Sequence, residues 1–384
     1  MRRTAGWLVG SVLMGLLLVG QAQAMSPAQA AIAAEGSNVY AVWWDATYGS
    51  VSICFRRSND GGATWSALKR LDIGEVSAPV IAVSAPNVYI AYQKYESPFM
   101  GIYVIKSEDR GKTWGSPVFV SAPSVSCSGV TLSAALSRVH VYWTQFYGST
   151  LLIGHNGSMD GGQTWAGCGY IPDTSGYRYA ACASAAGPAD TLSWRDGTSG
   201  GWGYYRHEAD SWTLWMRTVD GIQREGLQTD CSDTASGLIW TEAAIGASTV
   251  YFSRVEFDPV IPWTEKVALS RAVYCESPRL AHADASVYAA WGGDVPPTIL
   301  DAVYFTRSTD KGLTWKPDKR LSPAGHSCLG VRLAAAGSNV YVTWWESVKT
   351  AAGPRMSLYF RRSLDRGWSW MPAQKIGSQF FGKV

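Results

Sequence analysis

Three arginines occupy similar apolar surroundings in the sequence and could together bind an anion. They are Arg178 in GYRYA, Arg279 in SPRLA and Arg332 in GVRLA. A guanidinium group binds a carboxylate through two parallel hydrogen bonds, so three of them at one place would clamp an acidic ligand. Alternatively, each arginine pairs with an acid in its own surroundings, as most arginines in folded proteins are paired or solvated. The sequence leaves both interpretations open.

Carboxylates recur beside tryptophans, a combination that suits sugar recognition. An aromatic ring can stack on the apolar face of a sugar while polar groups hydrogen-bond its hydroxyls. The recurrence itself favours another interpretation, in which the rings belong to the core. The combinations are Trp44-Asp45, Trp194-Arg195-Asp196, Trp240-Thr241-Glu242, Trp291 followed by Asp294, and Trp345-Glu346.

An octet that ends in tryptophan recurs along the chain at intervals of about 50 residues, with one gap of three such intervals between its third and fourth copies. Such a period indicates a repeat architecture. Two eroded copies fill the gap, GWGYYRHEADSWTLW (201–215) and TVYFSRVEFDPVIPWTEKVAL (249–269). The full copies are SNDGGATW from Ser58, SEDRGKTW from Ser107, SMDGGQTW from Ser158, STDKGLTW from Ser308 and SLDRGWSW from Ser363. The seven resulting units are 28–74, 75–122, 123–173, 174–222, 223–272, 273–324 and 325–378.

Each unit has the pattern of four short strands. NVYAVWWD and SICFRRS alternate apolar and polar residues, the octet turns the chain, and WSALKRLD leads away. A segment of smaller apolar residues, such as PVIAVSA, comes first and would line a crowded centre. We therefore expect an all-β, seven-bladed β-propeller with four-stranded blades, in which the octets are hairpins between strands three and four. It would form one domain over residues 25–384.

This fold would separate the octets from a ligand site. The octet hairpins lie on one face, whereas first strands begin and second strands end on the opposite face. Arg178, Arg279 and Arg332 align at one position of the first strand in units four, six and seven, where other units have Val80 or Thr131. Because the carboxylates at second-strand ends belong to the same rim, a site is expected there.

The octet itself has the chemistry of a tight turn. Its Ser and Asp can accept hydrogen bonds from backbone amides, its fifth residue is a glycine that can adopt a positive φ, and its tryptophan buries a large ring. The pattern S-x-D-x-G-x-[ST]-W resembles the Asp-box, or BNR, repeat of sialidases and other secreted propellers. The repeat covers almost the whole mature chain, and what it implies is fold rather than a particular reaction.

The resemblance to sialidases also implies possible roles for individual residues. Sialidases hold the substrate carboxylate with three arginines and use a tyrosine nucleophile, an assisting glutamate and an aspartate acid/base. By this resemblance Asp45 is the candidate acid/base and Glu242 the residue assisting a tyrosine, with Tyr177 and Tyr274 nearby in sequence. Two features depart from the family. The first inner strand, AQAAIAAEG, lacks the aromatic-Arg-Ile-Pro signature, and sialidases typically have six blades rather than seven units.

The N-terminus and composition predict the compartment. Residues 1–24 show two arginines, an apolar run and Ala22-Gln23-Ala24, which is the layout of a secretory signal peptide cleaved after Ala24. The run is short for a membrane span. A secreted or periplasmic protein is therefore expected, with no membrane span after cleavage.

Charge and cysteine usage narrow the function classes. The chain has 33 Lys and Arg against 30 Asp and Glu, and two of the arginines lie in the signal. Almost no net charge is left to neutralise nucleic-acid phosphates, so a nucleic-acid partner is not expected. The five histidines are scattered, and we expect neither a metal nor a cofactor. Seven cysteines cannot all pair with one another. Four are expected just ahead of first strands, on the face of the arginines, namely Cys127, Cys231, Cys275 and Cys328.

Three functions remain compatible with these patterns. The first is a secreted module that binds a glycan or an extracellular protein through the rim bearing the three arginines. The second is an exo-sialidase-type glycoside hydrolase that uses those arginines on a sialic acid carboxylate. The third is a non-catalytic assembly scaffold.

Overall fold

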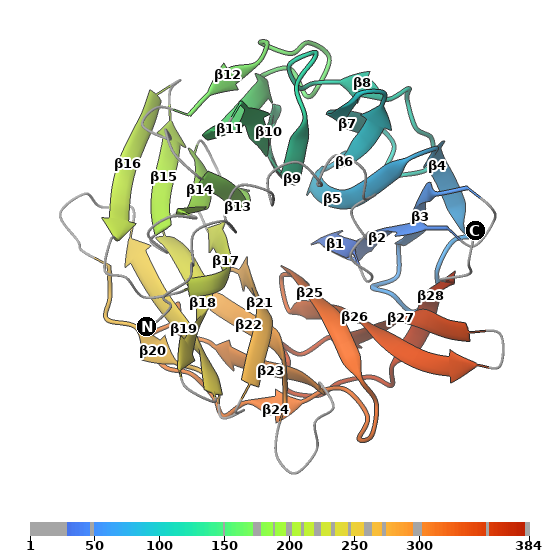
Figure 1. Ribbon diagram of the computed structural model, residues 1–384. Helices are drawn as coiled ribbons and strands as arrows, with labels where there is room; N and C mark the ends of the chain where they lie inside the picture. Colours follow the sequence, from blue (N-terminus) through green and yellow to red (C-terminus); the bar gives the residue numbers. More distant parts are fainter. Residues whose placement is uncertain are drawn as a thin grey trace, which may run out of the picture.

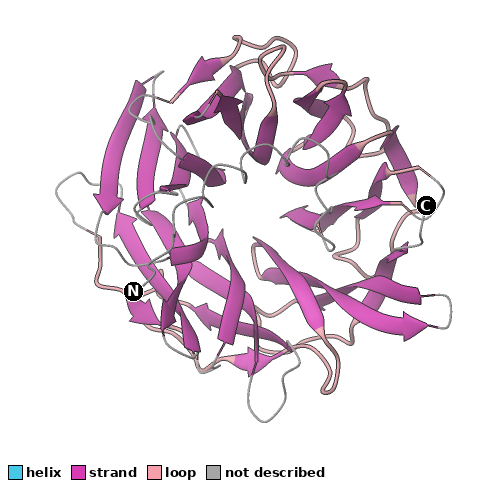
Figure 2. Cartoon of the chain, in the orientation of Figure 1, coloured by secondary structure: helices cyan, strands magenta, loops and turns pink. Residues whose placement is uncertain are grey.

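A computed structural model describes residues 29–46, 50–148, 150–171, 178–186, 189–196, 202–208, 211–218, 224–231, 235–244, 247–256, 263–270, 274–294, 302–350 and 353–380. The regular elements in these ranges are strands, which form seven four-stranded antiparallel sheets. The sheets radiate from a common centre (Figure 1), so the expected all-β propeller fold is confirmed. Figure 2 shows the same strands joined by loops and turns. Within the described ranges, no helix has both the length and the apolar character needed to cross a membrane.

Each sheet is one continuous stretch of chain whose strands pair in sequence order. The first sheet contains β1 (Ala30–Glu35), β2 (Asn38–Asp45), β3 (Ser52–Ser58) and β4 (Lys69–Ile73), and the second β5 (Val76–Ser84), β6 (Asn87–Glu96), β7 (Phe99–Ser107) and β8 (Val118–Phe119). The third contains β9 (Cys127–Ala135), β10 (Arg138–Tyr147), β11 (Thr150–Ser158) and β12 (Gly169–Tyr170), and the fourth β13 (Arg178–Ala186), β14 (Ala189–Asp196), β15 (Trp202–Glu208) and β16 (Ser211–Thr218). The fifth contains β17 (Arg224–Cys231), β18 (Ala235–Ala244), β19 (Ala247–Glu256) and β20 (Val267–Ala268), and the sixth β21 (Tyr274–Ala283), β22 (Ser286–Asp294), β23 (Ala302–Ser308) and β24 (Lys319–Arg320). The seventh contains β25 (Cys328–Ala336), β26 (Asn339–Thr350), β27 (Gly353–Ser363) and β28 (Gln374–Phe380).

The first strand of every sheet lies innermost (Figure 1). These inner strands contact one another in order around the ring, and β25 of the last sheet contacts β1 of the first. Small residues are frequent in several of these strands, as in AAIAAE of β1 and CLGVRLAAA of β25. Small side chains allow neighbouring inner strands to approach closely at the centre.

The second and third strands supply the core between sheets. All eight residues of β2 except the first are buried, and β22 is buried along almost its whole length. The tryptophans predicted as core residues are buried to 3% exposure or less. Their interpretation as core residues is confirmed, and sugar stacking on these rings is ruled out by their burial. They are Trp44, Trp194, Trp240, Trp291 and Trp345.

The octets form turns between the third and fourth strands, with the same hydrogen bonds in each copy. In the first, Ser58 Oγ donates to Asp60 Oδ1 at 2.6 Å and accepts from the Gly62 amide at 2.8 Å. The Thr64 amide and hydroxyl donate to the same carboxylate at 2.9 and 2.6 Å. These bonds lower the pKa of Asp60, first through Ser58 and then through Thr64. The ionised side chain therefore holds the turn together.

Each turn also joins its sheet to the preceding one. Trp114 meets the ring of Phe55 edge-on, with centroids 4.9 Å apart, and Trp65 meets Phe360 of the last sheet in the same way at 5.0 Å. An ideal Cβ on Gly62 would lie 2.4 Å from Phe360, so this turn fits only a residue without a side chain. We call these segments octet turns. The contacts show that they hold neighbouring sheets together as well as turning the chain.

Candidate functional site

The face opposite the octet turns carries an aromatic groove in the second sheet. β6 ends there at Glu96, β7 begins there at Phe99, and the connection from β8 to β9 crosses it. The groove has a volume of about 360 Å³. Phe99 and Phe119 are large apolar residues, yet they are 36% and 42% exposed, respectively, rather than buried in the core. The lining residues are Glu96, Phe99, Gly101, Tyr103, Phe119, Ala122, Pro123, Ser124 and Val125.

Backbone geometry determines how the rings of the groove lie. Phe119 lies against Gly101 so closely that a Cβ there would approach its ring to 2.7 Å. The ring of Tyr103 is tilted against Phe119, with centroids 5.3 Å apart, and is stacked on Tyr92 on its other side at 6.2 Å. Tyr92 is fully buried. The ring row therefore runs from the core to the surface, which holds the exposed end in place.

A polar network fixes the inner end of that row. The hydroxyl of Tyr92 donates to Asp72 Oδ2 at 2.7 Å, and Lys94 Nζ donates to the same oxygen at 3.0 Å. Lys94 also lies over the Tyr103 ring, 5.5 Å from its centroid. Asp72 belongs to β4 of the first sheet, so two sheets together support the groove.

Tyr103 and Glu96 provide the polar groups at the mouth of the groove. Burial, followed by a hydrogen bond to the Glu96 carboxylate, raises the pKa of Tyr103 to about 12. The tyrosine therefore keeps its proton at physiological pH and acts as a donor. Glu96 is exposed and retains acceptor capacity for a ligand hydroxyl.

The strand register separates the three predicted arginines. Arg279 pairs with Ala290 and Arg332 with Thr343, each as the first residue after a β-bulge. Arg178 instead pairs with Asp196 at the very start of β13, and the residue after its bulge is Cys182. The expectation that all three share one strand position is wrong. The bulges add residues that a comparison of short apolar segments does not detect.

Arg279 and Arg332 thus lie midway along inner strands rather than at the rim. Both are half-buried, and each donates from Nη1 to the carbonyl of the preceding residue at 2.9 Å. Their strands are neighbours around the ring. Only the backbone of Arg178 lies within the described part of the chain.

The surroundings of Arg279 include the carboxylate of Glu276. The Glu276 side chain reaches solvent but also lies across Gly292, with Oε1 3.4 Å from the position of a Cβ there. Desolvation and then the Asp294 carboxylate raise the pKa of Glu276, and Arg279 opposes the rise. The interpretation of the arginines as partners of nearby acids therefore describes Arg279 well.

The two candidate carboxylates lie in sheets that are not neighbours. Asp45 ends β2 in the first sheet and is 3% exposed. Glu242 is in β18 of the fifth sheet, where it accepts from Trp240 Nε1 at 2.9 Å, pairs with Arg224 Nε at 3.3 Å and binds Lys266 Nζ. Lys266 lies over the Tyr251 ring as well. Glu242 is therefore held by three donors, which is typical of a structural carboxylate.

The tryptophan and acid of β26 are connected in the same manner. Trp344 Nε1 donates to Glu346 Oε1 at 2.9 Å, and His326 Nδ1 lies 2.8 Å from Glu346 Oε2. The corresponding pair in β10 is Trp143 and Gln145, at 3.1 Å. Among the combinations seen in the sequence, Trp240 and Glu242 thus pair a buried indole with an acceptor, and in β26 the indole that bonds Glu346 is Trp344 rather than Trp345.

One of the two tyrosines and one of the four cysteines are not found where the sequence placed them. Tyr177 lies outside the described residues, and Tyr274 is 54% exposed at the start of β21, opposite Asp294. Cys127, Cys275 and Cys328 stand at the starts of inner strands, as expected. Cys231 does not. It ends β17 on the other face, because the polar sequence REGLQTDC hid the strand that precedes it. The six cysteines whose side chains the structure describes are free thiols.

The aromatic groove itself was not predicted from the sequence. Phe99, Tyr103 and Phe119 read as ordinary strand residues in FMGIYVI and PVFV. The available signal was the spacing of Phe99 and Tyr103, which places both on one face of β7.

Comparison with known proteins places the chain by fold. No protein family profile matches the sequence, and no curated protein matches it significantly. Among solved structures, the polysaccharide lyase Uly1 is similar with a TM-score of 0.57 and 11% identity, covering 89% of this chain and 91% of that one. The Hadza microbial sialidase Hz136 is similar with a TM-score of 0.50 and 14% identity, covering 76% and 71%. A prolyl endopeptidase is similar with a TM-score of 0.54 and 13% identity, covering 90% of this chain but 49%, about half, of its own. At these identities the likeness shows the β-propeller fold.

Proposed function

We propose that this protein is a secreted or periplasmic carbohydrate-binding propeller whose seven sheets are its blades and whose octet turns are Asp-boxes. It binds a glycan on the face opposite those turns. The observation that carries the proposal is the aromatic groove of the second sheet, with exposed Phe99 and Phe119 beside Glu96 and Tyr103.

The chemistry of the groove suits a sugar. Phe119 and Phe99 offer exposed rings to the apolar face of a pyranose, and the Glu96 carboxylate and the Tyr103 phenol oxygen offer acceptors to its hydroxyls. Support from the row of rings behind Tyr103 limits the entropy lost on binding. The named functions of two similar folds, a sialidase and a polysaccharide lyase, support a glycan among the ligand classes.

We propose binding rather than hydrolysis. Glu242 is held by three donors, Asp45 is buried in a sheet that does not neighbour that of Glu242, and the raised pKa of Tyr103 disfavours its phenolate. Arg279 and Arg332 lie on inner strands of the sixth and seventh sheets and do not line the groove, so this proposal gives them no part in binding. An exo-sialidase activity would instead appear as release of fluorophore from a methylumbelliferyl sialoside that Arg279→Ala abolishes.

The test is a glycan array with the purified protein, followed by calorimetric titration of the best neutral oligosaccharide. Phe119→Ala should weaken binding by about ten-fold or more, because it removes a ring of the size that contributes about 1.5–3 kcal/mol on burial. Val118→Ala is the matched control, since Val118 is its equally exposed neighbour in β8 and does not line the groove. Failure of the wild type to bind any glycan overturns the proposal and favours a scaffold. If Phe119→Ala binds as well as the wild type, the groove is not the glycan-binding site.

A further inference from the structure

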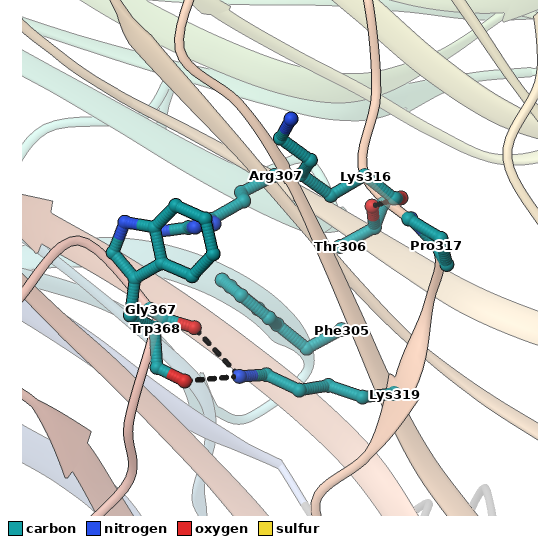
Figure 3. Close-up of a pocket in the computed structure, with 8 residues that line it drawn as sticks. All are labelled: Phe305, Thr306, Arg307, Lys316, Pro317, Lys319, Gly367 and Trp368. Carbon is teal, nitrogen blue, oxygen red and sulfur yellow. Dashed lines mark hydrogen bonds between the residues drawn. The ribbon is translucent and has the colours of Figure 1, made fainter.

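A second cavity lies at the junction of the sixth and seventh sheets, on the side of the octet turns. Its volume is about 220 Å³. The octet turn of the seventh sheet forms one wall through Gly367 and Trp368, and the outer strands of the sixth sheet form the other (Figure 3). The remaining lining residues are Phe305, Thr306, Arg307, Lys316, Pro317 and Lys319. The cavity is thus remote from the aromatic groove both around the ring and across its two faces.

The lining is cationic. Three of its eight residues are Arg307, Lys316 and Lys319, and none of the eight is acidic. Arg307 Nη1 donates to the Arg366 carbonyl at 2.6 Å, and Lys319 Nζ donates to the carbonyls of Gly367 and Trp368 at 2.7 and 2.9 Å. Carbonyl oxygens orient these groups but do not neutralise a full charge.

The Asp365 carboxylate of the neighbouring octet turn is engaged within that turn. Asp365 accepts from Ser363 Oγ at 2.7 Å and from the Ser369 amide and hydroxyl at 2.9 and 2.6 Å. Burial lowers the pKa of Arg307, and burial together with Arg307 lowers that of Lys319. An anion entering the cavity would relieve both effects.

Trp368 is the feature that sets this junction apart. Its ring is 66% exposed and lies over the guanidinium of Arg307, with Cζ 3.4 Å from the ring centroid. The sixth octet position is Ala63, Lys112, Gln163 or Leu313 in the other copies. Because those turns fold without a tryptophan there, the ring is free to serve a ligand.

An internal comparison separates the structural from the additional residues. At the junction of the first and second sheets, Arg57 and Lys69 donate to the carbonyls of Arg110 and Lys112, as Arg307 and Lys319 do here. The arginine and lysine therefore belong to the repeated sheet contact. At the first junction, Lys112 stands in place of Trp368 and Ser66 in place of Lys316. The indole and the third cation of the cavity are therefore not part of the repeated sheet contact.

We infer that this cavity binds an anionic sugar residue, one bearing a sulfate or carboxylate group, independently of the groove. The anionic group lies among Arg307, Lys316 and Lys319, and the sugar ring lies against the exposed indole of Trp368. The site extends the proposed function to a second face and does not depend on the groove binding a glycan.

Calorimetric titration with glucosamine 6-sulfate, glucuronic acid, glucose and inorganic sulfate tests the inference. At least one of the two anionic sugars should bind, with affinity falling as salt is raised, whereas glucose should bind at least ten-fold more weakly at this site. The sulfated and carboxylated probes identify which anion is preferred. Inorganic sulfate should also bind at least ten-fold more weakly, because it lacks a ring.

Variants locate the binding. Trp368→Ala should weaken the anionic sugar by about ten-fold and Lys316→Gln by about three-fold, while Leu364→Ala, an exposed residue of the same turn outside the lining, should change nothing. Phe119→Ala should leave it unchanged, which separates failure of this site from failure of the groove. Absence of binding by both anionic sugars overturns the inference, as do equal affinity for inorganic sulfate and undiminished binding by Trp368→Ala with an unfolding temperature like that of the wild type.

Discussion

The five sheets with an octet turn and the two without one solve the same problem differently. In three of the five octet sheets the fourth strand has only two residues, namely β8, β12 and β24, and the side chains of the turn hold the chain ahead of it in place. The fourth sheet has no octet, and its β16 pairs with β15 over seven residue pairs, from Glu208 with Ser211 to Trp202 with Thr218. A long backbone ladder thus replaces a side-chain network.

The fifth sheet is intermediate between these two solutions. Trp263 meets Tyr204 of the preceding sheet edge-on at 5.1 Å, as the octet tryptophans do. The Thr264 amide donates to the Arg254 carbonyl at 2.9 Å, which matches the bond from Ser66 to Arg57 in the first sheet. The ring contact between sheets therefore survives where the Ser and Asp of the octet are gone. This suggests that packing between sheets is the more general requirement.

The largest effect is expected from removing the aromatic ring that contacts the tryptophan of the next sheet, at one junction with an octet and at one without. Phe360 and Tyr204 are both fully buried against a tryptophan of the next sheet. Phe360→Ala and Tyr204→Ala should each lower the free energy of unfolding by about 3–5 kcal/mol, as large-to-small core changes do. Urea unfolding measures both. A much smaller loss for Tyr204→Ala would mean that the octet, rather than the ring contact, joins the sheets.

A glycine substitution sharpens the role of the turn. Gly62 has φ +83° and its Cβ would collide with Phe360, whereas adjacent Gly61 has φ +66° and nothing nearer than 3.6 Å. Gly62→Ala should cost about 2–3 kcal/mol from the strained backbone and the collision together, and Gly61→Ala about 1 kcal/mol from backbone alone. Equal losses in thermal unfolding would show that close approach to the neighbouring sheet is unimportant.

The smallest effect concerns acid. Burial opposes ionisation of Asp310 and Asp365. Hydrogen bonds outweigh this effect and lower the pKa of each carboxyl to about 2; they come from Ser308 and Thr314 to Asp310, and from Ser369 and Ser363 to Asp365. A depressed carboxyl pKa stabilises the fold above its unfolded value of about 3.9, and this contribution disappears as pH falls from about 4 to about 2. The free energy of unfolding of Asp365→Asn should therefore lie below that of the wild type by about 0.5–1 kcal/mol at neutral pH, a figure already reduced for solvent screening. At pH 2 the two should differ little.

Thermal unfolding between pH 2 and 7 measures this difference. Asp284→Asn, in the turn between β21 and β22, serves as the control carboxylate outside an octet. If Asp365→Asn shows the same deficit at every pH, ionisation of the octet is not what stabilises the turn.

Periodicity made the fold predictable, whereas local irregularity hid the site. The alternation in NVYAVWWD and the octet spacing required strand, turn and neighbour, so they predicted a propeller. The register of Arg178 relative to Arg279 depended on a bulge, which the sequence does not mark clearly. The groove depended on which of many aromatic residues remain exposed, and that is decided by packing between sheets rather than by the strand pattern around Phe119.

The junction between the first and last sheets has a consequence for how the number of sheets in such a molecule can change. The first and last sheets share no strand, and they meet through Trp65 on Phe360 and through Arg362, which donates to the Asp60 and Gly61 carbonyls at 3.1 and 2.9 Å. These are the contacts used at the other octet junctions. Duplication or deletion of one whole unit therefore demands no new kind of joint, and a gene built from such copies can lengthen or shorten while its circle still closes.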